Sequence, residues 1–228
     1  MKRPPLELVR QFDTHRLIPS RHLPGTDSVL VAIADDDAHL QAIFDIDAAT
    51  NDRLLAGQRL MPGIGVEELL FGVPNAAIVN AAFCHPHPLG GRFNTPERGA
   101  WYAAFELATS QAEVGFHKSV QLAEIGRFED SVTYDDYLAD FSAEFHDLRG
   151  ARGFRAALSP DTYVESQSLA EDLMNVESLG IVYPSVRHRG GTCVACFRPA
   201  LVGNVRRAKT YRFTWSGGPE PLVALERA

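Results

Sequence analysis

Short apolar segments, separated by glycine, proline and polar residues, divide the chain into candidate strands and helices. Apolar runs too short for a helix predict strands, and apolar residues at helical spacing predict helices. The expected strands are 14–19, 76–83, 101–105, 179–184, 192–197 and 205–215. The expected helices are 35–55, from 109 or 110 to 125, and 159–176. Residues 131–148 fit both a helical stripe and a strand alternation, so periodicity leaves this segment open.

The length and composition are those of a single globular domain. The 228 residues are 45% hydrophobic and 22% charged, a balance that can fill a core. Residues 1–13 are polar with two prolines and predict a loose N-terminal arm, and residues 216–228 predict a loop-like tail. The folded domain is therefore expected over residues 14–215.

Charge and hydropathy exclude several classes of protein. A net charge of −7 disfavours a general nucleic-acid or anionic-membrane binder, because either would need a basic surface. No apolar stretch approaches the roughly 20 residues that span a bilayer, and no apolar segment of a signal peptide follows the charged start. Three cysteines do not make a disulfide framework in a chain of this length. The expected location is the cytoplasm.

Two cysteine-containing motifs are weak metal candidates. Cys84, His85 and His87 are interleaved with prolines and have no fourth ligand at a usual spacing. Cys193 and Cys196 form a C-x-x-C pair without the second pair of a zinc ribbon, and they lie in a strand pattern where positions three apart face opposite sides. The acidic run 35–37 is better explained by capping of a helix start. No metal is expected.

The most informative stretch runs from Leu89 to Glu113. The turn Gly90-Gly91 presents Arg92, a buried strand carries Tyr102, and a helix start carries Glu113. A cation, an aromatic face and a carboxylate can together hold and cleave an anionic ligand with a glycosidic bond. The structural alternative for Glu113 is a capping box, because Ser110 and Glu113 have the spacing of that motif.

These motifs resemble the RES domain family. The resemblance lies in Gly90-Gly91-Arg92-Phe93-Asn94, Trp101-Tyr102-Ala103-Ala104, Ala112-Glu113 and the segment 180–187, Gly-Ile-Val-Tyr-Pro-Ser-Val-Arg. It extends from about Arg16 to Phe197. Residues 35–83 are longer than the family's usual connection at this place and are expected to form a helical insertion. The family's N-terminal arginine is assigned to Arg16, with Arg21 as the alternative.

The resemblance implies a single mixed α+β domain with a bent, largely antiparallel sheet like that of ADP-ribosyltransferases, flanked by helices. It also implies an NAD glycohydrolase or NAD phosphorylase, with NAD as a consumed substrate and no bound cofactor. The catalytic residues would be Glu113, Arg92 and Tyr102. The substrate-binding residues would be Arg16, Ser185 and Arg187.

The family consists of toxins from toxin–antitoxin pairs, so the resemblance implies an Xre-type antitoxin as partner, and a homodimer stays open. The nucleophile that accepts the sugar is also open among water, phosphate and a protein side chain. Two other functions are retained: an ADP-ribosyltransferase that modifies a protein target, and a non-enzymatic binding module whose pocket has decayed.

Overall fold

One long strand connects most of the sheet. The structure, a computed structural model, describes residues 3–20 and 63–227. Strand β3 (Glu129–Asp147) pairs with β1 (Leu6–Pro19), with β6 (Gly203–Ser216) and, at its end, with β4 (Gly180–Pro184). Along β3 the side chains from Tyr137 to Phe145 are buried at every second position. The segment is therefore a strand, and its alternation, not its helical stripe, describes it.

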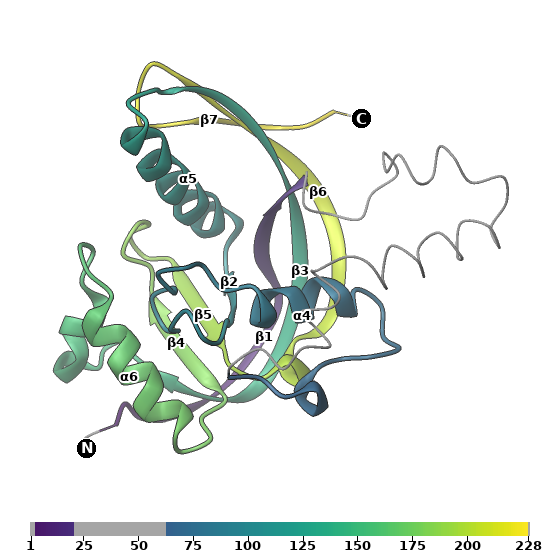
Figure 1. Cartoon of the computed structure of the whole chain (residues 1–228), viewed down its shortest axis with the longest axis vertical. Helices are drawn as coiled ribbons and strands as arrows, with labels where there is room; N and C mark the ends of the chain where they lie inside the picture. The colour runs from purple at the N-terminus through teal and green to yellow at the C-terminus, as the bar shows by residue number, and fades with distance from the viewer. Residues whose placement is uncertain (1–2, 21–62, 228) are drawn as a thin grey trace, which may run out of the picture.

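The sheet has seven strands and is largely antiparallel, as predicted. Its order is β1-β2-β5-β4-β3-β6-β7, where β2 is Trp101–Ala104, β5 is Thr192–Cys196 and β7 is Leu222–Leu225. Only the pair β3–β4 is parallel among the pairs described. Because β1 also pairs with β3, strands β1, β2, β5, β4 and β3 close into a ring, and the sheet must bend to do so (Figure 1).

Three helices cover three separate parts of the core. Helix α4 (Ala76–Cys84) packs on the face of the ring that contains Trp101 and Phe141, and α6 (Val164–Met174) packs on the opposite face around Tyr183. Helix α5 (Leu107–Glu124) lies over the cluster that contains Trp215 of β6. In Figure 1, α5 and α6 lie toward opposite ends of the molecule. The short 3-10 helices are η2 (Val66–Glu68), η3 (Arg152–Leu158) and η4 (Pro199–Leu201).

The structure corrects three predictions. The loose arm over 1–13 is wrong from Leu6 onward, because β1 begins there and pairs with β3. The strand predicted over 76–83 is helix α4, which shows that a short apolar run does not distinguish a strand from a buried helix. The loop-like tail contains β7, paired with β6.

The helix predicted over 159–176 is shorter, since α6 begins at Val164 and ends at Met174. The strands predicted at 101–105, 179–184, 192–197 and 205–215 are confirmed within two residues. The strand predicted at 14–19 is confirmed at its end, but it begins eight residues earlier, at Leu6. The predicted helix at 35–55, the acidic run 35–37 and the alternative arginine Arg21 lie outside the described residues. Of the predicted insertion, residues 63–83 are described and contain η2 and α4.

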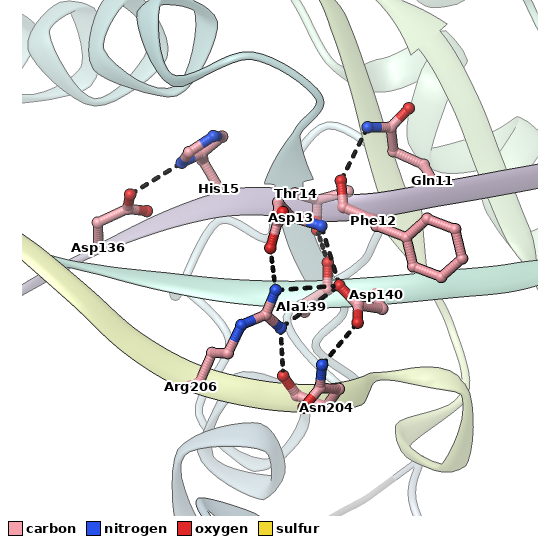
Figure 2. Close-up of polar contacts among 10 residues, drawn as sticks. All are labelled: Gln11, Phe12, Asp13, Thr14, His15, Asp136, Ala139, Asp140, Asn204 and Arg206. Carbon is pink, nitrogen blue, oxygen red and sulfur yellow. Dashed lines mark hydrogen bonds and ion pairs between the residues drawn. The ribbon is translucent and has the colours of Figure 1, made fainter.

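A bulge divides β1 into two halves. The register with β3 shifts between Gln11 and Thr14, and Asp13 adopts a left-handed φ of 54°. The Asp13 amide donates to Asp140 Oδ1 at 2.9 Å, and its carboxylate forms an ion pair with Arg206 (Figure 2). These contacts compensate the strained conformation, and the extra residue changes which side chains of β1 face the core.

Candidate active site

The Gly90-Gly91-Arg92 turn is held in one conformation by close packing. Gly90 has a left-handed φ of 72°, and the Gly91 amide donates to the Asn94 carbonyl at 3.0 Å. A side chain at Gly91 would place its Cβ 2.5 Å from Asn94 Oδ1 and 2.9 Å from the hydroxyl of Tyr102. Glycine is therefore required here, and the turn fixes where Arg92 leaves the backbone.

Tyr102 supports this turn from β2. Its hydroxyl donates to Asn94 Oδ1 at 2.9 Å and accepts the Phe93 amide at 2.8 Å. Burial raises the pKa of the phenol, so the hydroxyl stays protonated and can act as a donor. The hydroxyl is thus committed to positioning the turn, and only the ring is left to contact a ligand.

Arg92 is buried, with 6% of its surface exposed. Its Nη1 donates to the Ser159 carbonyl at 2.7 Å, and its guanidinium lies 4.7 Å from the centre of the Tyr163 ring. Its Nη2 is buried without a hydrogen-bond partner among the described residues. A buried cationic donor left unpaired is costly, so Arg92 is prepared to bind an additional acceptor.

Glu113 lies in the second turn of α5. The helix begins at Leu107 and Glu106 occupies the N-cap, so the capping box of Ser110 and Glu113 is not formed. Instead, the Ser185 hydroxyl donates to Glu113 Oε1 at 2.6 Å, and the Cys193 thiol lies 3.9 Å from the same oxygen. A tertiary contact across 72 residues therefore orients this carboxylate.

Ser185 uses its full hydrogen-bonding capacity in this arrangement. Besides donating to Glu113, its oxygen accepts the backbone amides of Arg187 at 3.1 Å and His188 at 2.9 Å. The His188 ring turns away to Thr109, whose own hydroxyl hydrogen goes to Glu106, so His188 is the donor in that contact. Ser185 has no histidine base here, and its contacts are those of a residue that orients Glu113.

Arg187 connects α5 to the segment that precedes α6. Its guanidinium lies 3.5 Å from the centre of the Phe116 ring, and its Nη2 donates to the Pro160 carbonyl at 2.5 Å. Its Nε is buried without a hydrogen-bond partner within the described residues. Arg92 and Arg187 therefore donate to the neighbouring carbonyls of Ser159 and Pro160, and each has one further N–H without a partner in the described part of the chain.

Arg16 reaches the same group of residues from β1. Strand β1 pairs with β2 only at His15 and Ala104, and Arg16 follows that position. Its Nη1 donates to the Tyr102 carbonyl at 2.9 Å, and its guanidinium lies 4.7 Å from the Trp101 ring centre. Burial lowers the pKa of Arg16 to about 10, which still leaves it charged at neutral pH. The guanidinium of Arg16 thus lies against Trp101, and its hydrogen bond to Tyr102 is to the backbone carbonyl and not to the side chain.

Electrostatic contacts join the six predicted site residues into one cluster. The phenol of Tyr102 interacts with both Arg92 and Arg16. The buried Tyr183 interacts with Glu113, Tyr102 and Arg92, and burial raises its pKa well above the ordinary value. Ser185 donates to Glu113 and accepts the backbone amide of Arg187. Each of the six predicted residues therefore interacts with at least one other member of the cluster.

Sequence reasoning missed three residues that belong to this cluster. His117, one turn after Glu113 on α5, has its pKa lowered by desolvation and by Arg187 and Arg92, while Glu113 opposes the shift. The buried Tyr183 interacts electrostatically with both Glu113 and Tyr102. Gln167 of α6 donates to the carbonyls of Leu89 and Gly91, both at 3.0 Å. The spacing of four from Glu113 could have indicated His117, whereas no local pattern indicates Gln167.

The cysteine motifs do not form a site. Cys84, Cys193 and Cys196 are buried free thiols. Cys193 packs on the α6 side of the sheet and Cys196 on the α4 side, as expected for strand positions three apart. In the part of the chain that the structure describes, no three His, Cys, Asp or Glu side chains gather in a way that would hold a metal ion.

Comparison with known proteins identifies one family. The model of the RES domain family matches residues 69–216. Among solved structures, the chain is similar to one in the crystal structure of the M. tuberculosis MbcT–MbcA toxin–antitoxin complex. The identity is 12%, the alignment covers 91% of this chain and 87% of that chain, and the TM-score is 0.49. No curated protein matches the chain.

Proposed function

The chain belongs to the RES domain family, and we propose that it consumes NAD by cleaving the bond between nicotinamide and ribose. The observation that supports this proposal most is the 2.6 Å hydrogen bond that fixes Glu113 in this cluster. The cluster also contains the buried Arg92 and the half-buried Arg187, each with one buried N–H group that has no hydrogen-bond partner among the described residues. Such a site offers one oriented anion for a positive reaction centre and two cations for a negatively charged ligand.

Cleavage of the bond between nicotinamide and ribose does not need general acid catalysis. When the C1′–N bond breaks, the electron pair goes to the pyridinium nitrogen and nicotinamide leaves as a neutral molecule. No general acid is therefore required, in contrast to the leaving alcohol of an ordinary glycosidase. The ribose is left with oxocarbenium character, which the Glu113 carboxylate stabilises electrostatically.

The unpaired donors support a binding role for the two arginines. Arg92 Nη2 and Arg187 Nε would donate to the pyrophosphate of NAD, because guanidinium groups bind phosphate oxygens in a directional manner. The Tyr102 ring would pack against the nicotinamide side, since its hydroxyl is held by the turn. Arg16 would contribute positive charge from its position at the Tyr102 carbonyl, against the Trp101 ring.

The nucleophile that attacks the ribose after nicotinamide leaves determines the second product. Water attacking C1′ gives ADP-ribose and releases a proton to solvent, whereas inorganic phosphate gives an ADP-ribosyl phosphate. We assign the protein to this hydrolase or phosphorylase class. Transfer to a protein side chain is a distinct outcome of the same bond cleavage and is distinguished by its product.

Loss of NAD would harm the cell that makes this protein, so we further propose that it acts as the toxin of a toxin–antitoxin pair in the cytoplasm. Its partner would be an antitoxin protein of the Xre type that covers the site. No helix within the described residues is long and apolar enough to cross a membrane. Expression without the partner should deplete cellular NAD and stop growth, and normal growth with normal NAD would contradict this role.

The proposal is tested by measuring nicotinamide release from NAD by the purified protein, with and without phosphate, and by identifying the second product. Glu113→Gln keeps the size of the side chain and should lower the rate by about 10²–10³. Glu124→Gln, at an exposed position of the same helix, is the matched control. A Glu113→Gln rate within about threefold of wild type would refute the electrostatic role. A labelled protein would indicate a transferase, and no product would indicate a binding module.

A further inference from the structure

The first half of β1 has one edge that no strand of the described residues covers. The Asp147 amide donates to the Pro5 carbonyl at 2.8 Å, and the register pairs Leu6 with His146. In an antiparallel pair, residues that exchange hydrogen bonds alternate with residues that do not. Positions 5, 7, 9 and 11 therefore bond to β3, and the N–H and C=O groups of Leu6, Leu8 and Arg10 point the other way.

Among the described residues, nothing pairs with that outward edge along residues 6–11. Strand β2 joins β1 only at His15, beyond the bulge, and within the described residues no backbone hydrogen bond reaches the outward groups of Leu6, Leu8 or Arg10. The side chains beside this edge are apolar and exposed, 55% for Leu6 and 54% for Leu8. An exposed apolar edge strand is a template for another strand.

We propose that a second copy of this chain pairs with this edge, β1 against β1 in antiparallel orientation, with Leu8 opposite Leu8 of the other copy. A two-fold axis requires outward-pointing residues to face outward-pointing residues, which allows registers centred on Glu7, Leu8 or Val9. The Leu8 register pairs residues 5–11 with 11–5 and places the exposed Leu6 and Leu8 of both copies on one continuous face.

The two neighbouring registers are less favourable. A centre at Glu7 sets two glutamates directly opposite each other at about 4.5 Å between Cα atoms, where like charges destabilise a sheet. A centre at Val9 pairs only residues 7–11, because the bulge after Gln11 ends the regular strand. In the Leu8 register, Arg10 lies opposite Leu6 and Glu7 opposite Val9, so no like charges meet. Both the charges and the bulge therefore favour the Leu8 register, in which the strand can pair with a second copy of itself without opposing like charges.

The register is tested by disulfide trapping in the full chain. Residues in a hydrogen-bonded antiparallel pair have Cα atoms about 5.5 Å apart, within the range that a disulfide spans. Leu8→Cys should form a covalent dimer under mild oxidation, and the native cysteines should not interfere because all three are buried. Leu6→Cys, equally exposed on the same strand and face, should stay uncrosslinked alone and should crosslink when mixed with Arg10→Cys.

Light scattering on the wild-type chain gives a second measurement. The mass should be near twice the 25.0 kDa of one chain at high micromolar concentration. Leu8→Lys should return it to the monomer, because two lysines would meet at the axis. A monomeric wild type, or a dimer that survives Leu8→Lys while Leu8→Cys fails to crosslink, would overturn the proposal.

Discussion

Replacement of Ser185 by alanine tests whether the site is built to orient its carboxylate. The change removes a donor 2.6 Å from Glu113 Oε1 and leaves the amides of Arg187 and His188 without their acceptor. A hydrogen bond to a charged group contributes about 1.5–3 kcal/mol. If the bond acts fully on the transition state, kcat/KM for nicotinamide release should fall about 10- to 150-fold.

A double-mutant cycle separates orientation from a general loss of structure. If Ser185 acts through Glu113, then Ser185→Ala should cost little more in a Glu113→Gln background, because the carboxylate it orients is already absent. Ser142→Ala, at an exposed serine of β3, controls for the loss of a hydroxyl, and thermal unfolding of each variant controls for stability. Fully additive effects, or a Ser185→Ala rate within about threefold of wild type, would refute the orienting role.

Three further predictions address other parts of the site and fold. Arg92→Lys should raise the Kd for NAD about tenfold or more, because an ammonium cannot replace a planar fork; an unchanged Kd by calorimetry would exclude the assignment. Gln167→Met, which keeps length but loses the donor, should lower kcat/KM several-fold, and Gln167→Lys should recover part of it; equal losses in both would indicate packing alone. Hydrogen bonding to Arg98 lowers the pKa of Glu68 to about 2, so Glu68 stabilises the fold above pH 4.5 and loses this contribution as the pH falls toward 2. Solvent screening of this partly exposed ion pair keeps the contribution well below the roughly 3 kcal/mol of the full shift. The stability of Glu68→Gln should therefore fall less steeply than that of wild type between pH 4.5 and 2. An acid unfolding transition identical to that of wild type would contradict this role of Glu68.

The sequence allowed us to predict which side of a strand a residue faces, where both sides of the strand are buried. In β5, Cys193 and Cys196 pack on opposite sides of the sheet, as a period of two requires. The C-terminus of α5 was also predictable, because Gly126 adopts a φ of 66° and its amide donates to the Ala123 carbonyl. These features depend on the local backbone alone.

The start of α5 was not predictable, because a distant strand determines it. Glu106 occupies the N-cap, and its carboxylate accepts the Thr109 hydroxyl at 2.7 Å and the Thr192 amide at 3.0 Å. This contact to the start of β5 begins the helix before Ser110, so the local capping signal of Ser110 and Glu113 was misleading. The displaced start leaves Glu113 free to meet Ser185.

The carbonyl groups that hold the two arginines also could not be predicted from local sequence rules. Arg92 and Arg187 are separated in sequence, yet they donate to consecutive carbonyls, Ser159 and Pro160. Turn chemistry predicted that Gly90 and Gly91 would present an arginine, but not what would hold its guanidinium. Contacts between segments so far apart in the chain leave no periodic pattern in a single sequence, so they could not be predicted from it.

Fixing two guanidinium groups at adjacent carbonyls has an electrostatic consequence. Like charges held close together repel. Desolvation is the main cause of the lowered pKa of His117, and Arg187 and Arg92 add to it while Glu113 opposes it. The chain as a whole carries a net charge of −7, so this positive region is local and opposite in sign to the average surface. A bound anion would relieve the repulsion and satisfy the free N–H groups at once. The proposed binding of a doubly charged pyrophosphate is therefore compatible with an acidic protein that is no general binder of nucleic acid, because the positive charge is confined to one set of anchored side chains.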